Sequence, residues 1–330
     1  MHCQVKSFVG LALLIATTGV SRAADGPLSL ATSIELPGVT GRIDHLAFDP
    51  RTQRLFVAAL GHESIEVLDT KTGTHVTSLS GFAEPQGIAV APDARIVTVA
   101  NRRNGQVQLL NADDFHQGPS LRPGRDADNV RYDANANRFY VGFGSGGIMG
   151  IDPRDGTITG QVAVASHPES FQLEHASGRM FVNVPDAGIV AVIDRSAMTV
   201  TMTFQVSAAR ACFPMALDEA NHRLFIGCRQ PAKLVVLDTA NGHVVTTFDT
   251  VQDADDLFYD AARKRVYVSG GEGFLDVIGE PAPSTFARIA RITTAPGART
   301  SLFVAEQNRF YLAVPRRDSQ RAEIRVYDAH

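Results

Sequence analysis

The sequence predicts an all-β fold, and three observations carry this prediction. An apolar run, an acid, a short polar turn, a basic residue and an aromatic or β-branched run return in this order seven times along the 330 residues. Val, Ile, Phe, Tyr and Thr alternate with polar residues between Gly, Asn and Asp turns, which is typical of strands and hairpins. No stretch has the 3.6-residue periodicity of an amphipathic helix.

The composition excludes several broad classes of protein. With 44% hydrophobic and 20% charged residues, the chain is neither wholly disordered nor a multi-span membrane protein. The 31 basic and 35 acidic residues give a net charge of −4, which does not favour binding to nucleic acid. Three cysteines are too few for a disulfide scaffold.

The first residues, 1–23, are predicted to be a secretory signal peptide. Lys6 precedes the apolar run 8–16, and Ser21-Arg22-Ala23 supplies the small residues of a cleavage site. The run is too short to span a bilayer as a helix. We therefore expect a periplasmic or secreted protein that has no membrane segment after cleavage, whereas the alternative is an uncleaved anchor.

The repeat has a fixed period and two halves. Its first half reads LAFDPRTQRLFVA at 46–58 and VRYDANANRFYVG at 130–142, and the second half reads LVVLDTANGHVVTTF at 234–248. The basic residues that anchor successive copies lie 41 to 44 residues apart: Arg54, Arg95, Arg138, Arg179, Arg223, Arg265 and Arg309. Each copy supplies four antiparallel strands, and such a sheet buries both faces only by stacking radially on its neighbours. Residues 24–330 are thus predicted to form one domain, a seven-bladed β-propeller.

The two ends of the chain are predicted to close the ring together. The last copy stops after its third strand, EIRVYD at 323–328, while an unassigned strand, LSLATSIEL, occupies 28–36. Pairing that N-terminal strand onto the last blade would protect an open edge. The alternative is a frayed tail.

A family resemblance follows from these motifs. The RLFV and RFYV runs, the LDTxxG turns and FVNV at 181–184 resemble the YVTN-repeat, YncE-like family of bacterial seven-bladed propellers over about 28–330. The resemblance implies the fold and leaves the function open, because a propeller is a scaffold whose role depends on its loops. Tryptophan is absent, so the Trp-Asp dipeptide of WD repeats is absent too.

The candidate site lies where the innermost strands begin, on what we call the top face. Stepping back five residues from the acid of each turn, or from the aligned residue in the second and seventh copies, gives equivalent positions that should converge on the central channel. They are Asp44, Gln86, Asp128, Glu169, Phe213, Asp255 and Arg299. The ligand-binding residues predicted from these and the adjoining positions are Asp44, His45, Asp128, Asn129, Glu169, Asp255, Asp256 and Arg299.

Two functions are compatible with this set of residues. The favoured one is a non-catalytic, monomeric propeller that binds a small molecule or a periplasmic protein, and no nucleic acid, through its top-face funnel. The alternative is a lactonase-type hydrolase in which Asp44, Asp128, Glu169 and Asp255 hold Ca²⁺ or Zn²⁺, since clustered carboxylates attract divalent ions. Polar channel linings without any ligand are also common.

Two cysteines remain after the predicted cleavage. Cys212 and Cys228 fall in the first and second strands of the fifth copy. An oxidising compartment would permit a disulfide. With a three-residue turn the two side chains face each other, whereas the register of the other blades offsets them by one residue and turns them to opposite faces. The sequence leaves this pairing open.

Overall fold

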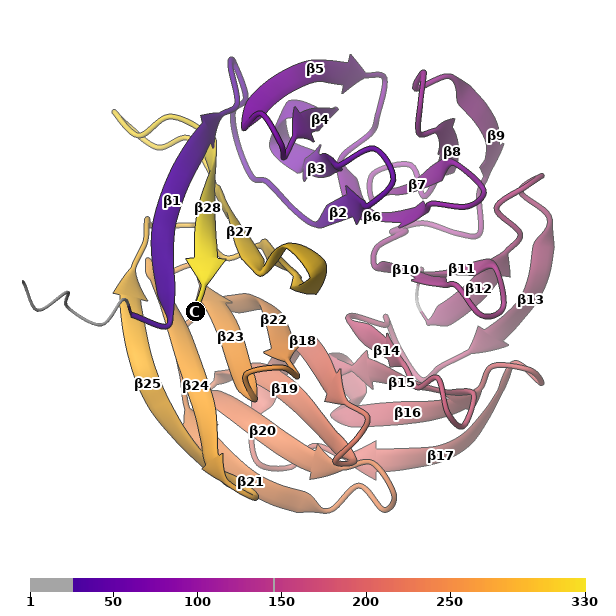
Figure 1. The fold of residues 1–330 in the computed structure, drawn as a ribbon. Helices are drawn as coiled ribbons and strands as arrows, with labels where there is room; N and C mark the ends of the chain where they lie inside the picture. The colour runs from indigo at the N-terminus through magenta and orange to yellow at the C-terminus, as the bar shows by residue number, and fades with distance from the viewer. Residues whose placement is uncertain (1–25, 145) are drawn as a thin grey trace, which may run out of the picture.

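The protein is a ring of seven antiparallel sheets around a central axis (Figure 1). The computed structural model describes residues 26–144 and 146–330, so the predicted signal peptide 1–23 lies outside the described residues. Within the described ranges, strands account for all elements except three short 3₁₀ turns: η1 (Leu60–His62), η2 (Pro185–Ala187) and η3 (Ala305–Gln307). The predicted all-β, seven-bladed propeller is confirmed. A search of the described residues finds no helix with the length and hydropathy needed to cross a membrane.

Each blade has four strands, and the first strand of blades 1 to 6 lies nearest the axis. Blades 1 to 3 are β2 (Leu46–Asp49), β3 (Arg54–Ala59), β4 (Ser64–Asp69) and β5 (Thr74–Ser80); β6 (Pro85–Ala91), β7 (Ile96–Asn101), β8 (Val107–Asn111) and β9 (Gln117–Leu121); and β10 (Val130–Asp133), β11 (Arg138–Phe143), β12 (Gly147–Ile151) and β13 (Ile158–Ala163). Blades 4 to 6 are β14 (Phe171–Leu173), β15 (Arg179–Val184), β16 (Ile189–Asp194) and β17 (Thr199–Gln205); β18 (Arg210–Asp218), β19 (Arg223–Gln230), β20 (Ala232–Asp238) and β21 (Val244–Asp249); and β22 (Ala254–Asp260), β23 (Arg265–Gly270), β24 (Phe274–Ala282) and β25 (Thr285–Thr293).

Blade 7 joins the two ends of the chain. It contains β26 (Ser301–Val304), β27 (Arg309–Val314), β28 (Glu323–Ala329) and, as its outer strand, β1 (Leu28–Glu35). β1 pairs antiparallel with β28 over its whole length, and the two strands run side by side in Figure 1. The predicted closure by the N-terminal strand is confirmed.

The repeating acid and arginine have a structural role in the hairpin between the first two strands. Asp49 and Arg54 lie opposite each other at the end of the β2–β3 ladder, and Asp133 and Arg138 do so in β10–β11. The Asp49 carboxylate accepts the backbone N–H of Arg51 at 3.0 Å, which holds the tight turn. These residues therefore recur because each blade needs the same turn.

Seven hydrophobic clusters occupy the seven interfaces between neighbouring blades. The cluster that closes the ring contains Ile34 and Leu36 from the N-terminal segment together with Leu46 of blade 1 and Tyr311 of blade 7. The inner strands are buried on both sides, while outer strands such as β5 alternate exposed and half-buried positions. Stacking around the ring buries apolar faces that a lone blade would expose.

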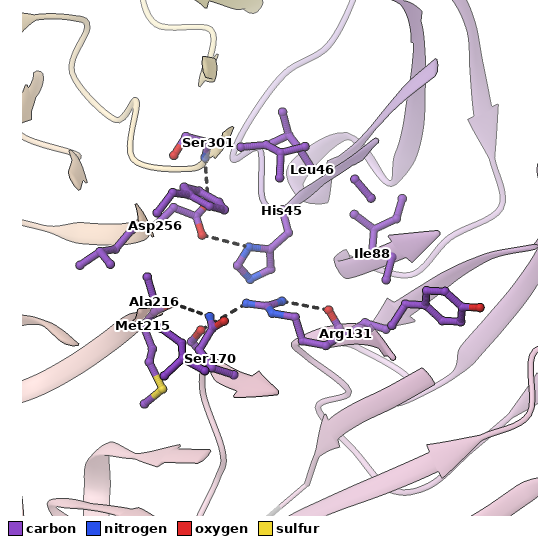
Figure 2. Close-up of a pocket in the computed structure, with 18 of the residues that line it drawn as sticks. His45, Leu46, Ile88, Arg131, Ser170, Met215, Ala216, Asp256 and Ser301 are labelled. Atoms are coloured by element: carbon purple, nitrogen blue, oxygen red, sulfur yellow. Dashed lines mark hydrogen bonds and ion pairs between the residues drawn. The ribbon is translucent and has the colours of Figure 1, made fainter. Parts of the chain in front are cut away.

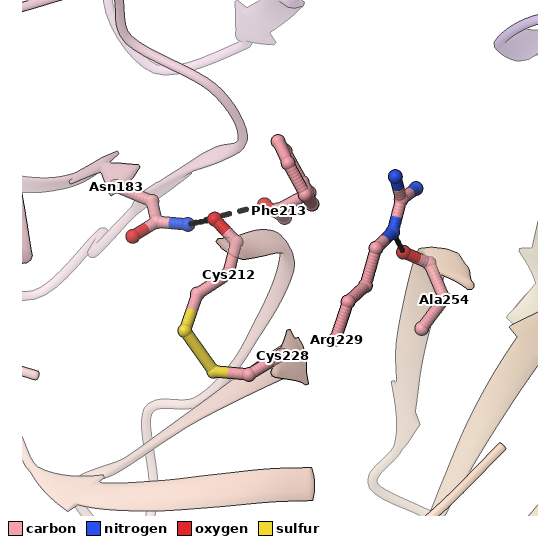
Figure 3. The surroundings of a disulfide bond; sticks show 6 residues. All are labelled: Asn183, Cys212, Phe213, Cys228, Arg229 and Ala254. Carbon is pink, nitrogen blue, oxygen red and sulfur yellow. Dashed lines mark hydrogen bonds between the residues drawn. A yellow bond between two sulfur atoms is a disulfide. The ribbon is translucent and has the colours of Figure 1, made fainter. Parts of the chain in front are cut away.

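A disulfide joins the first two strands of blade 5 (Figure 3). Continuing the pairing of Met215 with Ile226 would place Phe213 opposite Cys228, but a bulge between Cys212 and Met215, like those in the first hairpins of blades 2 and 6, shifts the pairing so that Cys212 lies opposite Cys228. The two side chains then share one face, and their sulfurs are bonded. Asn183 of blade 4 donates its amide to the Cys212 carbonyl at 2.6 Å, which ties the bulge to the neighbouring blade.

Candidate functional site

The predicted positions converge at the top of the central channel. Ten residues enclose a small cavity of about 20 Å³, and we call them and the cavity the funnel: Arg42, Asp44, His45, Gln86, Asp128, Asn129, Glu169, Ser170, Phe213 and Asp255. Arg299 adjoins the funnel, because its Nε lies 2.9 Å from an Asp255 carboxylate oxygen. Asp256 lies one residue deeper and contacts His45. All eight residues predicted as a binding site are thus close to one another.

Arginines neutralise two of the four predicted carboxylate ligands. Arg42 lies 2.7 Å from Asp44 and 3.4 Å from Asp255. Asp255 also receives Arg229 at 2.6 Å, in addition to Arg299. Burial nevertheless raises the pKa of Asp44 to about 6, with Arg42 opposing the shift. The attraction that a divalent cation would find at Asp44 and Asp255 is therefore much reduced.

Arg229 reaches the funnel from the top end of β19. It stacks over the Phe213 ring at 4.3 Å and donates its Nε–H to the Ala254 carbonyl at 2.9 Å (Figure 3). Neither Arg42 nor Arg229 is among the eight residues predicted from the sequence as a binding site. Both reach carboxylates of the funnel because a long guanidinium side chain crosses from one blade to the next.

The remaining two carboxylates form a separate group with His167. One ligand atom each from Asp128, His167 and Glu169 lies within 4.8 Å of the other two. His167 Nδ1 carries a proton that it donates to the Gly144 carbonyl at 2.7 Å, and Nε2 lies 3.5 Å from Asp128 Oδ2. An imidazole and two carboxylates are a ligand set that suits Zn²⁺ better than Ca²⁺, so this group fits the predicted metal more closely than the four carboxylates do.

Protons take part in the charge balance of this group. Burial, reinforced by the charge of Asp128, raises the pKa of Glu169 to about 8, so Glu169 is mostly protonated at neutral pH. Burial would lower the pKa of His167, but Asp128 and the Gly144 carbonyl outweigh it and raise that pKa to about 9. A neutral Glu169 and a cationic His167 beside Asp128 leave the group without excess negative charge.

Three residues that line the funnel have buried polar atoms without hydrogen-bond partners. Within residues 26–144 and 146–330, Gln86 Oε1, Asn129 Oδ1 and Arg42 Nε are buried and make no hydrogen bond. A buried polar atom left unpaired costs about 1–3 kcal/mol. The cavity is about the size of one water molecule or hydroxyl group. A hydroxyl group or a water molecule, which can both donate and accept, matches two acceptors and one donor.

A second layer begins directly below the funnel. His45 lies between Asp44 Oδ1, at 3.6 Å from Nε2, and Asp256 Oδ1, at 3.5 Å from Nδ1. Asp256 also accepts the backbone N–H of Ser301 at 2.8 Å (Figure 2). Burial alone would lower the pKa of His45, but Asp256 and Asp44 raise it to about 9. His45 is therefore an imidazolium that links the two layers.

The loops around the funnel carry several arginines, two of which are compensated. Arg102 lies 3.2 Å from Glu84 and 3.5 Å from Asp126, and Arg103 pairs with Glu63 and Glu84. Arg316 and Arg317 line a neighbouring cavity of about 310 Å³ together with Arg42 and Arg299. The positive charge of the rim is thus concentrated beside blade 7.

Comparisons with known proteins show the fold. No family model matches the chain. Over 187 residues, 53% of this chain, it is 26% identical to THO complex subunit 3 of Arabidopsis thaliana, and it spans 56% of the length of that curated relative. A chain in a crystal structure of the mitotic checkpoint complex superposes over 100% of both chains with a TM-score of 0.79 and 14% identity. The protein is a seven-bladed β-propeller.

Proposed function

We propose that the protein is an exported propeller of the YVTN-repeat, YncE-like kind that binds a small ligand or a protein partner through its funnel without catalysing a reaction. The observation that carries this proposal is the set of unpaired polar atoms of Arg42, Gln86 and Asn129 around one small cavity. A fixed cavity with unsatisfied donors and acceptors is pre-organised for a polar group.

Two further observations support export and a protein partner. Residues 1–23 have the pattern of a cleavable signal, and disulfides such as that between Cys212 and Cys228 persist in oxidising compartments. The relatives found by sequence and by structure are named for complexes, which favours a role in assembly for this propeller as well. A partner would then insert a hydroxyl side chain into the funnel.

The charge pattern favours binding over hydrolysis. A lactonase-type mechanism needs a metal held by free carboxylates and a carboxylate that can accept a proton from water. Here the arginines Arg42, Arg229 and Arg299 engage Asp44 and Asp255. Glu169, with a pKa of about 8, holds its own proton at neutral pH. The residues of the funnel are therefore arranged to hold a polar group in place.

The experiment uses purified protein comprising residues 24–330 and a panel of small hydroxyl and amino compounds: glycerol, glucose, ethanolamine and putrescine. Ligand-observed NMR detects binding and also shows whether each compound is changed chemically. Gln86→Met and Asn129→Leu keep the shape of each side chain and remove its polar atoms. Gln117→Met, at an exposed position of the outer strand β9, is the matched control.

We expect at least one compound to bind the wild-type protein and the Gln117→Met control, to bind both funnel variants at least about tenfold more weakly, and to be recovered unchanged. Losing one hydrogen bond with its buried partner accounts for such a factor. Equal binding by all four proteins, no binding of any compound, or chemical conversion of a bound compound would overturn the proposal.

A further inference from the structure

One position of the repeat carries a charge that its equivalents lack. Three residues after each of the converging positions of the inner strands, the other six blades have Ala47, Ala89, Gln172, Ala216, Phe258 and Leu302. Blade 3 has Arg131. This position is on β10, below the funnel, so a guanidinium group enters a level of the channel that is otherwise apolar or neutral.

The contacts of Arg131 are all with neutral groups. Its guanidinium donates to the Val130 carbonyl at 2.9 Å and to the Ser170 hydroxyl at 3.2 Å, and it lies 5.6 Å from the centre of the Phe171 ring. In the described part of the chain, no carboxylate oxygen comes within salt-bridge distance of it. Two of its five N–H groups are used, which leaves three to bind another acceptor.

Asp256, an acid of the same layer, already interacts with two other groups. Asp256 accepts the backbone N–H of Ser301 and faces the His45 imidazolium. His45 also faces Asp44, and Asp256 and Asp128 are the acids whose charge acts on Arg131, but within the described residues neither of these two lies at ion-pair distance from its guanidinium. Burial lowers the pKa of Arg131, which is the expected effect on a cation that lacks a close counter-charge.

The space around Arg131 is a cavity of about 350 Å³ in the central channel (Figure 2). Side chains from all seven blades line it, and most are apolar, including Leu46, Ile88, Met215 and Leu257. The labelled His45, Arg131, Ser170 and Asp256 lie near the middle of the view, and the labelled apolar residues Leu46, Ile88 and Met215 lie around them (Figure 2). This volume lies at the lower end of the range for small-molecule sites, which combine apolar walls with a few placed polar groups.

We propose that the channel binds an organic carboxylate with an apolar body, whose carboxylate pairs with Arg131 beside the Ser170 hydroxyl and whose body lies against the apolar wall. A carboxylate suits the planar fork of a guanidinium. A cationic ligand would meet like charge, and an inorganic anion would leave the apolar walls unfilled. The site is a separate cavity that shares His45 and Ser170 with the funnel, and this proposal does not depend on what the funnel binds.

The probe is octanoate, measured by isothermal titration calorimetry on residues 24–330, since the chain contains no tryptophan for a fluorescence assay. Octanamide has the same body without the charge, and inorganic phosphate has charge without the body. Arg131→Gln removes the cation and Arg131→Lys keeps it. Arg122→Gln, at an exposed position, is the matched control.

We expect one octanoate per chain and equal affinity in the Arg122→Gln control. Arg131→Gln should weaken binding at least about tenfold, as for loss of a hydrogen-bonded charge pair, with Arg131→Lys in between. Octanamide and phosphate should each bind at least about tenfold more weakly than octanoate.

Equal binding of octanoate and octanamide, full affinity in Arg131→Gln, tight binding of phosphate, or no octanoate binding at millimolar concentration would overturn the proposal. If Arg131→Gln does not fold, the comparison of octanoate with octanamide on the wild-type protein decides. Asn129→Leu separates this proposal from the funnel proposal, because it should leave octanoate binding unchanged.

Discussion

Reducing the bond between Cys212 and Cys228 is expected to lower the free energy of unfolding by about 3 kcal/mol. The two cysteines are 16 residues apart, and closing a loop of that size removes roughly 10 cal/mol/K of entropy from the unfolded chain. The entropy of unfolding of a chain this long is about 0.6 kcal/mol/K, at about 2 cal/mol/K per residue. Dividing the loss of about 3 kcal/mol by this entropy of unfolding gives a fall of about 5 °C in the thermal midpoint.

The assay is a thermal melt followed by circular dichroism, with and without reductant, on the wild-type protein and on Cys212→Ala/Cys228→Ala. Reductant should lower the wild-type midpoint and leave the double variant unchanged. The variant itself should melt at or below the reduced wild type, because both cysteines are buried and lose packing as well. Equal midpoints of oxidised and reduced wild-type protein, or two titratable thiols in the denatured unreduced protein, would refute the reasoning.

Three further predictions concern the funnel and the ring closure. Between about pH 4.5 and pH 8 the folded state keeps the proton of Glu169 and the unfolded state loses it, so the free energy of unfolding falls as pH rises. Thermal melts across this range should show a smaller fall for Glu169→Gln than for the wild type. An equal dependence of the midpoint on pH in both proteins would contradict a pKa near 8 for Glu169. Ile34 is 3% exposed and lies on the strand that closes the ring, so Ile34→Ala should lower the free energy of unfolding in urea by about 3 kcal/mol and Ile34→Val by about 1 kcal/mol. If Ile34→Ala lowered it by less than about 0.5 kcal/mol, the strand would not close the ring. Chelation with EDTA should leave the midpoint unchanged, because arginines compensate Asp44 and Asp255 and because His167 is cationic and Glu169 protonated. A fall of several degrees would contradict this and indicate a bound metal, held either by the four carboxylates or by Asp128, His167 and Glu169.

The fold could be predicted from the sequence because the repeat encodes a local structure seven times. The acid and the arginine of each first hairpin, such as Asp49 and Arg54, are set by turn geometry, which acts over a few residues. The place of β1 was predictable for a different reason. Blade 7 lacked one strand, β1 had no blade of its own, and an open edge in a ring is unfavourable.

Which residues converge in the funnel was predictable for the same reason, since equivalent positions of a ring meet at its axis. Their ion pairs were not. Arg229 of blade 5 crosses to Asp255 of blade 6, and Arg42 before blade 1 reaches the same carboxylate. These contacts depend on how far a flexible side chain extends between blades, which no spacing within one repeat specifies.

The disulfide is a second feature that the repeat alone does not predict, here within a single hairpin. The register set by the hairpin turn predicts Phe213 opposite Cys228, and one extra residue in the bulge replaces it with Cys212. A shift of one residue changes the face on which a side chain lies. The pairing was therefore open until the bulge was located.

The two proposed binding sites are formed at positions where the seven blades carry different residues. Positions that the blades share, such as the turn acid, serve the blade itself, and a symmetrical ring of identical side chains would have no preferred direction for a ligand. At the level of Asp44 the seven residues differ in charge and size, and three residues deeper a single arginine stands among small, neutral or apolar side chains. The two levels face different cavities and are linked by His45. A polar group above and a carboxylate with an apolar body below would therefore bind to separate layers of one channel, and Asn129→Leu and Arg131→Gln should each abolish only one of the two.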